Sequence, residues 1–537
     1  MTVVASNNLK HRMDTLSDTR GIHRWMTQCG YSPEEMRVRA ALLSRVLDTF
    51  RQSFPEEREV YLLRTPGRIN LMGVHIDHQG GWSNHMAIAR ETLFCFSPRA
   101  DGTLRAKNCS PEYPDREFSI AHELPDSARG RWLEFIETSR LPRGDWGNYL
   151  KAGALKLQDH FRQIPIRGMN AVVGGDIPPK AGLSSSSTLV VSVVKALEAV
   201  NGLSLPPQQG VELCGEAEWY VGTRGGSGDH AAILLSHAGS VTHVGFKPLR
   251  VEYCPFPPDY SVIFCSSGIE AAKAGTARET FNHRIAAYQT AFLLYRHLHP
   301  QKRERLLHLR DISPDNLDMP LWEFYTSMQS IPITAHLHEL RNHYPELKGE
   351  LERIISIYGE PAEGLPLREV LLFGVGECDR AKQFPKYLQQ GEIAKAGELM
   401  YISHDGDRVS EWIADRSRPY RSPYQNEYLV RLAEAAARSP EVERLSPAFQ
   451  PGGYRCSVPE MDRVVDYCKT LPGVLGAGLT GAGMGGAVLV LVRAEQSTQV
   501  VAKLRELVSL WRPGEPQVEI CRPVEGASFL PSDPVSR

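Results

Sequence analysis

The segment GMNAVVGGDIPPKAGLSSSSTLVVSVVKALEAV, residues 168–200, constrains the fold more than any other part of the chain. It begins with a short run rich in β-branched residues, which predicts a strand. A loop of Gly, Pro and Ser follows at 178–188, and an apolar run comes next in which polar residues recur only at 192, 195 and 198. Such a helix is buried on most sides. The segment therefore predicts a strand, a loop and a buried helix at the centre of a domain.

The loop at 178–188 has the composition of a phosphate-binding loop. Glycine lets backbone amides approach an anion closely, and the N-terminus of the following helix presents unpaired N–H groups to the same place. Four consecutive serines, 184–187, can donate to phosphate oxygens or contact Mg²⁺. The alternative is a flexible serine-rich turn whose hydroxyls only cap the helix.

Composition excludes several classes of partner. The 537 residues carry 61 basic and 63 acidic side chains without a dense Lys/Arg block, which argues against nucleic acid or an anionic membrane as the main partner and favours a small molecule. The N-terminus lacks an apolar signal region, and the longest aliphatic run, 487–492, is too short to span a bilayer. Ten scattered cysteines without a CxxC pair indicate reduced thiols. We expect a cytoplasmic protein, of an oligomeric state that the sequence does not reveal.

Periodicity divides the chain into regions of different character. Residues 1–55 predict a helical lead-in, and short strands alternate with turns from 61 to 173, with an amphipathic helix at 146–157. The stretch 276–401 is mainly helical and 405–453 is irregular. The end of the chain predicts a helix, a glycine loop that includes GAGLTG, and the strand 487–492.

Two common nucleotide-binding motifs do not explain the chain. No GxxxxGK[ST] is present, which argues against a P-loop enzyme. GAGLTG, 476–481, matches GxGxxG, but it follows a predicted helix and precedes a strand, the reverse of the order in a dinucleotide-binding dehydrogenase. The glycines continue through Gly483, Gly485 and Gly486, which allows close packing against a ligand or another loop, or else only a tight turn.

Two further segments hold candidate site residues. In RGGSGDHAAILLS, 224–236, Asp229 stands between a glycine loop and an apolar run, so it could accept a proton from a substrate hydroxyl or simply cap a helix that starts at His230. In GRINLMGVHIDHQGG, 67–81, polar side chains cluster and the glycine pair predicts a hairpin turn. His75, Asp77 and His78 could bind a transition metal, but no fourth ligand is evident.

Three glycine-containing segments, in this order, resemble the motifs of the GHMP family of small-molecule kinases, specifically its galactokinase branch. They are TPGRINLMGVHID (65–77), PPKAGLSSSST (178–188) and LTGAGMGGAVLVLV (479–492), and WGNYLKAGAL, CGEAEWYVGTRGGSGDH and TFNHR add to the similarity. The resemblance implies an α+β, two-lobed GHMP kinase fold, with an S5-like N-terminal lobe at 56–250 and a ferredoxin-like C-terminal lobe at 251–537. Helical insertions at about 290–370 and 405–453 have no counterpart in it.

The resemblance also assigns roles to individual residues. Asp229 matches the proposed catalytic base and Arg68 the arginine that supports it, while His75, Asp77 and the adjoining Gly228 match the sugar site. Ser186 matches the serine near Mg²⁺, and Glu218 is the best match for its acidic partner, although its spacing to Asp229 is one residue shorter than in the family. The ATP-binding loop comprises Lys180, Ala181, Gly182, Leu183, Ser184, Ser185, Ser186 and Ser187, and the C-terminal glycine motif comprises Gly481, Gly483 and Gly485.

Two departures from the family concern the sugar. Val74 replaces a glutamate that contacts a hydroxyl at the far end of the sugar, and Phe281 replaces a tyrosine. A carboxylate at C6 of the sugar would be repelled by glutamate but not by valine, so Val74 fits a hexuronate. The HIDHQGG run is also similar to that of plant galacturonate kinases, which lack the same glutamate. Galactose remains an alternative.

The leading interpretation is an ATP- and Mg²⁺-dependent sugar 1-kinase that phosphorylates the anomeric hydroxyl of galactose or galacturonate. A catalytically silent sensor of sugar and ATP is a second hypothesis, which the presence of Arg68, Asp229 and the serine loop disfavours. An NAD-dependent dehydrogenase that uses the loop at 476–486 is a distant third.

Overall fold

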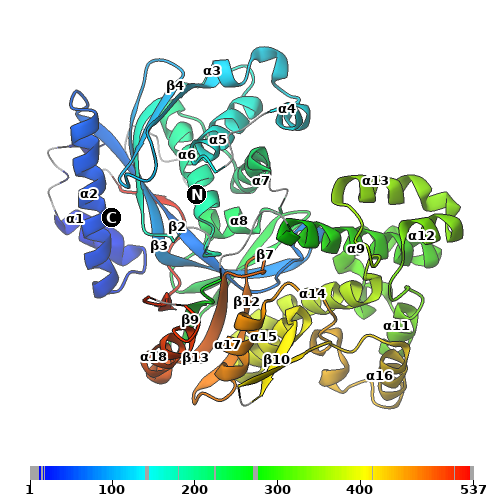
Figure 1. The fold of residues 1–537 in the computed structure, drawn as a ribbon. Coiled ribbons are helices and arrows are strands. Elements are labelled where there is room, and N and C mark those ends of the chain that lie inside the picture. The colour runs from blue at the N-terminus through cyan, green and yellow to red at the C-terminus, as the bar shows by residue number, and fades with distance from the viewer. Residues whose placement is uncertain are drawn as a thin grey trace.

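The computed structural model describes residues 11–13, 16, 19–139, 144–178, 181–222, 225–269, 276–413, 415–512 and 514–531. Two lobes, each built on its own β-sheet, lie one above the other, and a helical unit projects from one side (Figure 1). This is the two-lobed α+β architecture expected from the sequence.

The N-terminal lobe contains a mixed sheet of nine strands among the described residues. The predicted strands are present and longer than expected, and the turn at Gly80 joins an antiparallel hairpin as predicted. Its main path runs in the order β1 (His11–Arg12), β2 (Glu59–Met72), β3 (Trp82–Pro98), β6 (Met169–Gly175), β4 (Thr103–Asn108) and β5 (Arg116–Ser119). β7 (Ser240–Gly245) pairs with β3 and with β8 (Arg250–Pro255), and β15 (Ser528–Phe529) pairs with β2, so the end of the chain returns to this lobe.

Helices cover both faces of this sheet because successive strand residues point to opposite sides. Leu62 and Cys95 pack in the cluster that includes α2 (Pro33–Ser53), whereas Leu63 and Phe94 pack in the cluster beneath α5 and α6. The segment predicted as a helical lead-in therefore covers one face of the sheet, with α1 (Thr19–Gln28) beside α2. The other helices of the lobe are α3 (Ile120–Glu123), α4 (Trp132–Thr138), α5 (Gly147–His160), α6 (Ser185–Asn201), α7 (Pro207–Glu218) and α8 (Gly228–Leu235).

The C-terminal lobe contains an antiparallel sheet. Its order is β12 (Val474–Thr480), β13 (Ala487–Arg493), β9 (Tyr260–Ser266) and β14 (Val518–Cys521), and its helices are α14 (Leu367–Gln389), α15 (Ile393–Asp407), α17 (Pro459–Cys468) and α18 (Ser497–Val508). The prediction of one continuous glycine loop was wrong for 476–480. Those residues are part of β12, and Gly476 and Gly478 give α15 room to approach the strand, since a side chain at either would meet α15 backbone.

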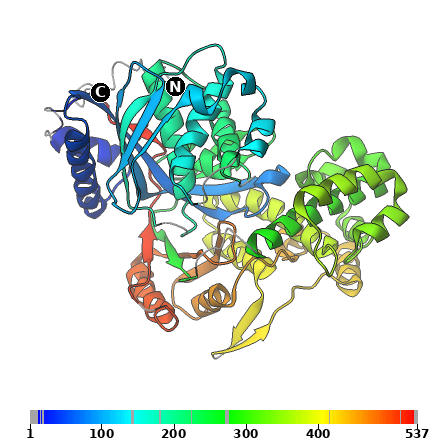
Figure 2. The same cartoon turned by 45° about the horizontal axis from the view of Figure 1, so that its top comes forward.

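The two predicted insertions form one helical unit. The first consists of the end of α9 (Thr276–Leu298), α10 (Pro314–Leu317), α11 (Leu321–Met328), α12 (Leu337–His343) and α13 (Lys348–Tyr358). The second is not purely helical, because α15 runs on to Asp407 and the hairpin of β10 (Ser410–Ile413) and β11 (Arg416–Pro419) precedes α16 (Asn426–Arg438). α11 packs against α16, and Tyr325 Oη donates to the Leu445 carbonyl at 2.5 Å. Figure 2 shows this unit beside the lobes and the hairpin at the lower edge.

Two findings concern the whole described chain. All ten cysteines are free, in agreement with the prediction of reduced thiols. Within the described segments, no helix is long and apolar enough to cross a membrane.

Candidate active site

Arg68 and Asp229 form the centre of the candidate site. Arg68 is buried in β2, and Asp229 lies in the first turn of α8. The guanidinium Nε and Nη2 donate to the two carboxylate oxygens of Asp229, each at 2.6 Å. Arg68 Nη1 donates to the Gly182 carbonyl at 2.7 Å, and Ser184 Oγ donates to Asp229. The structure thus brings together three segments that are far apart in the sequence.

The carboxylate of Asp229 is ionised at neutral pH. Burial by itself would raise its pKa, but the positive charge of Arg68 and the hydrogen bonds from Arg68 and Ser184 outweigh that effect, so the pKa lies well below its usual value. About a third of the side chain, 36%, is still exposed. A substrate hydroxyl can therefore reach a carboxylate that is ready to accept a hydrogen bond.

The serine loop and the N-terminus of α6 are built to receive an anion. Gly182 and Ser184 adopt positive φ of 81° and 61°, which turns the chain sharply into a helix of 17 residues. Ser184 makes no side-chain capping bond, because its hydroxyl is directed to Asp229. Ala181 and Leu183 are buried, while Ser185 and Ser186 are half-buried. First-turn amides at such an uncapped N-terminus suit phosphate oxygens. Lys180, also predicted for this loop, lies outside the described residues.

Glu218, the predicted acidic partner of Mg²⁺, lies at the end of α7. Its Oε2 accepts a hydrogen bond of 2.7 Å from Ser187 Oγ and is 3.0 Å from His230 Nε2. The serine bonded to Glu218 is thus Ser187, the neighbour of the predicted Ser186. Hydroxyl and carboxylate oxygens are the ligands that Mg²⁺ prefers.

The C-terminal glycine motif faces the serine loop from the other lobe. Gly481, Gly483 and Gly485 all have positive φ, and a Cβ added to Gly481 would lie 3.7 Å from the Gly182 carbonyl oxygen. A Cβ on Gly483 would overlap the Cys456 carbonyl. These glycines therefore permit a close approach to neighbouring backbone segments. The sequence had left this interpretation open beside that of a simple tight turn.

Asp77 lies near Asp229, in the 3₁₀ turn Asp77–Gln79 that ends at Gly80. Burial opposes its ionisation, but hydrogen bonds from His78 lower the pKa of Asp77 overall. A side chain on Gly226 would overlap the Asp77 carboxylate, and a Cβ on Gly228 would lie 3.4 Å from Asp77 Oδ2. Gly226 therefore needs to be glycine to leave this carboxylate its space, whereas the contact at Gly228 is of ordinary van der Waals length.

His75 has a left-handed φ of 62°, and its ring is enclosed by other aromatic rings. It stacks on Tyr454 with centroids 4.2 Å apart, and the Phe281 ring lies edge-on at 6.3 Å. Its Nε2 is 3.3 Å from Asp407 Oδ2. Among the described residues, the side chains spaced for a metal ion are His75, Asp407 and Cys456. The hypothesis of a metal site made by His75, Asp77 and His78 therefore has no support in the geometry.

Val74 is buried in the main hydrophobic cluster. The N–H groups of Gly73 and Val74 both donate to Glu377 Oε1, at 2.8 and 3.0 Å, and Arg380 Nε donates to Glu377 Oε2 at 2.7 Å. The Glu377 carboxylate of α14 thus lies next to the loop at Gly73 and Val74, and both of its oxygens accept hydrogen bonds from protein groups.

Sequence reasoning did not identify several residues of this region, among them Glu377, Asp407 and His85. His85 lies in β3, and burial together with the charge of Arg68 lowers its pKa to about 4, so that its imidazole is neutral. A Cβ on Gly228 would lie 3.3 Å from His85 Nε2, which places His85 beside the candidate site. No local motif marks Glu377 or His85, because each reaches the site only through tertiary packing, whereas Asp407 ends the stretch ELMYISHDGD, 398–407, which is similar to galactokinases.

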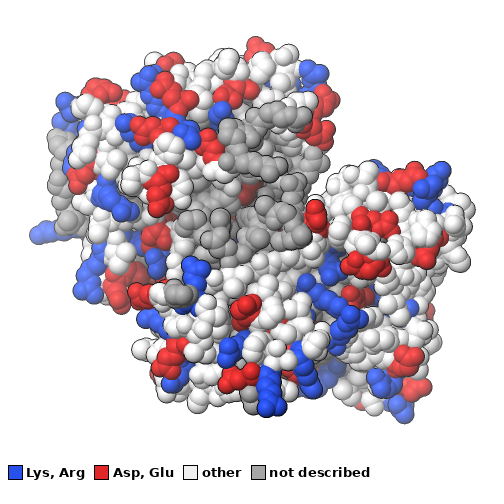
Figure 3. Space-filling view, in the orientation of Figure 1, with Lys and Arg blue, Asp and Glu red and all other residues white. Residues whose placement is uncertain are grey.

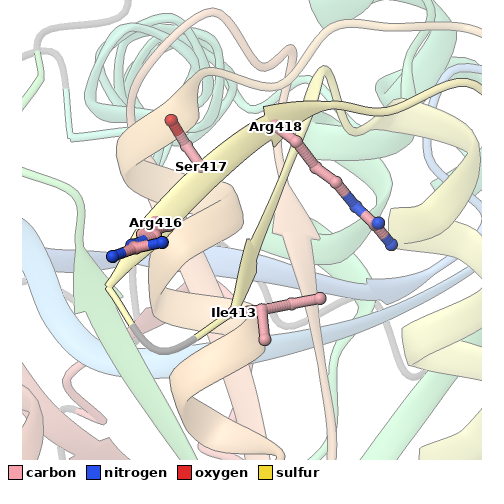
Figure 4. A pocket seen from close by; sticks show the side chains of 4 residues that line it. All are labelled: Ile413, Arg416, Ser417 and Arg418. Carbon is pink, nitrogen blue, oxygen red and sulfur yellow. The ribbon is translucent and has the colours of Figure 1, made fainter.

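Other surface features do not compete with this site. Lys and Arg are mixed with Asp and Glu over the face shown in Figure 3. A pocket on the β10–β11 hairpin is lined by Ile413, Arg416, Ser417 and Arg418 (Figure 4). It contains none of the residues of the three motifs.

Comparisons with known proteins agree with the geometry. Residues 148–237 match the model of the GHMP kinases N terminal domain, 425–510 that of the GHMP kinases C terminal domain, and 48–98 the galactokinase galactose-binding signature. The chain is 25% identical over 493 residues to a galactokinase of Chloroflexus aurantiacus, an alignment that covers 91% of this chain and 98% of the other. It is 24% identical to a galactokinase of Dictyostelium discoideum, with 83% of each chain covered.

A solved structure of similar fold is that of Lactococcus lactis galactokinase complexed with galactose. The TM-score is 0.62 at 20% identity, with 90% of this chain and 98% of the other covered. The serine loop and Asp229 lie within the matched N-terminal domain, and Arg68 and Val74 lie within the matched galactose-binding signature. The chain therefore contains the N- and C-terminal domains of the GHMP kinases, which are phosphotransferases, and carries the galactokinase galactose-binding signature.

Proposed function

We propose that this protein is an ATP- and Mg²⁺-dependent sugar 1-kinase that phosphorylates the anomeric hydroxyl of a galactose-type sugar, either galactose or galacturonate. The observation that carries the proposal is the Arg68–Asp229–Ser184 arrangement at the meeting point of the three motifs. The relatives named galactokinases support the choice of sugar class.

The residues present fit ATP and Mg²⁺. Gly182 and the uncapped N-terminus of α6 would hold the phosphates, and Ser186 and Glu218, with Ser187 bonded to Glu218, would supply oxygen ligands for Mg²⁺. ATP would supply the phosphoryl group, and Mg²⁺ would offset its negative charge.

The side chains of the sugar site have distinct roles in this proposal. Asp229 accepts the hydrogen bond of the anomeric hydroxyl and takes its proton during or after transfer. Arg68 keeps Asp229 ionised and stabilises the negative charge that develops on the sugar oxygen. Asp77 and His75 hold ring hydroxyls, and Phe281 borders His75.

Replacement of Asp229 tests the proposal. We expect Asp229→Asn to lower kcat with galactose or galacturonate by about 10²- to 10⁴-fold, because the amide cannot accept the proton. A coupled assay of ATP consumption measures turnover, and nucleotide binding should be retained. Asp101→Asn, which changes an exposed carboxylate, is the control and should leave turnover unchanged. Wild-type protein that turns over no ATP with either sugar would contradict the proposal and favour a sugar and ATP sensor.

The identity of the sugar is tested by Val74→Glu. The new carboxylate would repel a substrate carboxylate and could accept a bond from a hydroxyl. We therefore expect the ratio of kcat/KM for galactose over galacturonate to rise about tenfold or more. Val74→Leu adds volume without charge and serves as the control. An equal effect of both substitutions would show that size, not charge, acts at this position.

A further inference from the structure

Three buried side chains with three different donor atoms come together where the lobes meet. They are His75, which follows β2 of the N-terminal lobe, Asp407, which ends α15 of the C-terminal lobe, and Cys456, which precedes α17. One ligand atom of each lies within 4.8 Å of the other two. Asp407 and Cys456 are fully buried, and the side chain of His75 is 2% exposed. Nitrogen, oxygen and sulfur donors grouped so closely are typical of a transition-metal site.

Two of these donor atoms have no hydrogen-bond partner. His75 Nε2 and Asp407 Oδ2 are 3.3 Å apart, yet within the described part of the chain neither of them makes a hydrogen bond. An ordinary His–Asp pair would be joined by one, and two buried polar atoms without one are costly. Bonds of about 2.1 Å to a tetrahedral Zn²⁺ would place the nitrogen and the oxygen about 3.4 Å apart. A shared ion therefore accounts for both atoms and for their separation.

Backbone hydrogen bonds fix Asp407 and Cys456 relative to each other. The Cys456 N–H donates to Asp407 Oδ1 at 3.2 Å, and the Ser457 N–H donates to the Asp407 carbonyl at 3.0 Å. The Tyr454 N–H donates to the Gly406 carbonyl at 2.7 Å. Asp407 therefore uses one carboxylate oxygen inside its own lobe and leaves the other for the ion.

The imidazole of His75 is held by aromatic rings. It stacks on Tyr454 with centroids 4.2 Å apart and planes 16° apart. Phe281 and Phe373 lie at 6.3 and 6.1 Å from it. These rings orient the imidazole but give Nε2 no acceptor. An apolar shell of this kind around fixed ligands is a usual feature of a metal site.

We propose that His75, Asp407 and Cys456 bind a Zn²⁺ ion that joins the two lobes. Zn²⁺ accepts all three kinds of donor, whereas Mg²⁺ and Ca²⁺ prefer oxygen alone. When the ion binds, the Cys456 thiol releases its proton to solvent and the sulfur bonds to the metal as a thiolate. One carboxylate and one thiolate then balance the two positive charges, so that the buried site is neutral. A water molecule completes the tetrahedron.

The ion would also orient His75 for the sugar. With Nε2 on the metal, Nδ1 carries the proton and can donate to a ring hydroxyl. This consequence rests on the proposed sugar-kinase function, whereas the metal site itself does not. We therefore expect Cys456→Ala to raise KM for the sugar by about threefold or more without changing KM for ATP. An unchanged KM for the sugar would overturn this role of the ion.

The metal content of the untagged full-length protein tests the site. Mass spectrometry of the metals should find about one zinc per chain in wild type after incubation with Zn²⁺ and desalting, and at least about fivefold less in Cys456→Ala and Asp407→Asn. Cys468→Ala is the matched control, because Cys468 is also buried and free but lies outside the cluster; it should keep its zinc. Wild type with less than about 0.2 zinc per chain, or variants that retain it, would overturn the proposal.

Cobalt provides a second measurement on wild-type protein, which does not depend on the folding of a variant. After the zinc is removed with a chelator, added Co²⁺ should give the visible bands of a tetrahedral ion and a thiolate-to-metal charge-transfer band in the near ultraviolet. Removal of the metal should lower the Tm, and Zn²⁺ but not Mg²⁺ should restore it. Co²⁺ spectra without the thiolate band would overturn the site. Neither readout involves turnover, so bound zinc in a protein that phosphorylates no sugar would count against the proposed function alone.

Discussion

At the scale of single residues, Arg68 lowers the pKa of Asp229, and the bonds to Asp229 orient the guanidinium of Arg68. The arginine makes two parallel bonds to the carboxylate and a third to the Gly182 carbonyl, which fixes the plane of the guanidinium. Because the pKa of Asp229 is depressed in the folded protein, its contribution to stability is present at neutral pH and is lost only when the pH falls through the lowered pKa. Because the activity depends on the ionised Asp229, it should likewise be lost only when the pH falls through the lowered pKa of this residue.

Arg68→Gln should therefore change the pH profile as well as the rate. Without the positive charge, burial would dominate and would raise the pKa of Asp229, so the acid limb of kcat/KM should move to higher pH. The rate at its plateau should fall about 10²- to 10³-fold, because a charge-stabilising donor is lost. Both effects can be measured from kcat and kcat/KM of wild type and variant between about pH 4 and pH 8, the range in which carboxylates and histidines titrate. Arg90→Gln, which breaks a pair with Glu519, is the control. An unchanged acid limb in Arg68→Gln would contradict this account.

At the scale of elements, α14 contacts the loop that contains Gly73 and Val74, which we call the sugar loop. Glu377 and Arg380 are one turn apart on this helix, and both side chains are fully buried. Glu377 accepts the N–H groups of Gly73 and Val74, and Arg380 also donates to the carbonyls of Ala448 and Gln450. The pair thus ties the sugar loop and the segment after α16 to one helix.

We expect Glu377→Ala to lower the free energy of unfolding by about 3–5 kcal/mol, because it leaves Arg380 buried without its partner. Glu377→Gln keeps an acceptor for the two N–H groups and should cost less. Urea denaturation followed by tryptophan fluorescence measures both. The control is Glu392→Ala, which removes an exposed ion pair with Lys395 and should have little effect. Equal costs for Glu377→Ala and Glu392→Ala would show that the buried pair is not important to stability.

Elements also differ in how well their sequences specify them. The buried helix α6 and the strands β2, β3 and β6 were predictable, because long apolar or β-branched runs favour one structure strongly. GAGLTG was predicted as part of a loop, since glycine is a poor strand former, but α15 requires small residues where it crosses β12. The β10–β11 hairpin is short and mostly exposed, so it has little hydrophobic pattern from which to predict it.

At the scale of the whole molecule, the two lobes meet at a reciprocal pair of hydrogen bonds. Thr480, at the end of β12, accepts from the Asn70 N–H and donates to the Asn70 carbonyl, both at 3.1 Å. Thr480 is buried, and Gly481 beside it approaches the serine loop. These contacts set the position of the C-terminal glycine motif relative to Arg68.

Thr480→Val should therefore weaken the junction between the lobes. It leaves two backbone groups of Asn70 without a partner, which we expect to cost about 1–3 kcal/mol in the free energy of unfolding and to raise KM for the sugar. Thr470→Val, the same substitution at an exposed site, is the control. Urea denaturation and steady-state kinetics measure the two effects. Stability and KM equal to those of the control would show that the junction does not depend on Thr480.

The sequence by itself determined the class of fold, the strand, loop and helix of the serine segment, and the three motifs, because local propensity and hydrophobic period act over short distances. Only the tertiary structure decided that Ser184 bonds to Asp229, that Ser187 rather than Ser186 bonds to Glu218, and that α14 engages the loop around Val74. These contacts join residues 31 to 303 positions apart, and two of them select one of several equivalent serines. The packing of whole elements decides such contacts. Turning α6 about its axis by one residue would bring the next serine to Glu218.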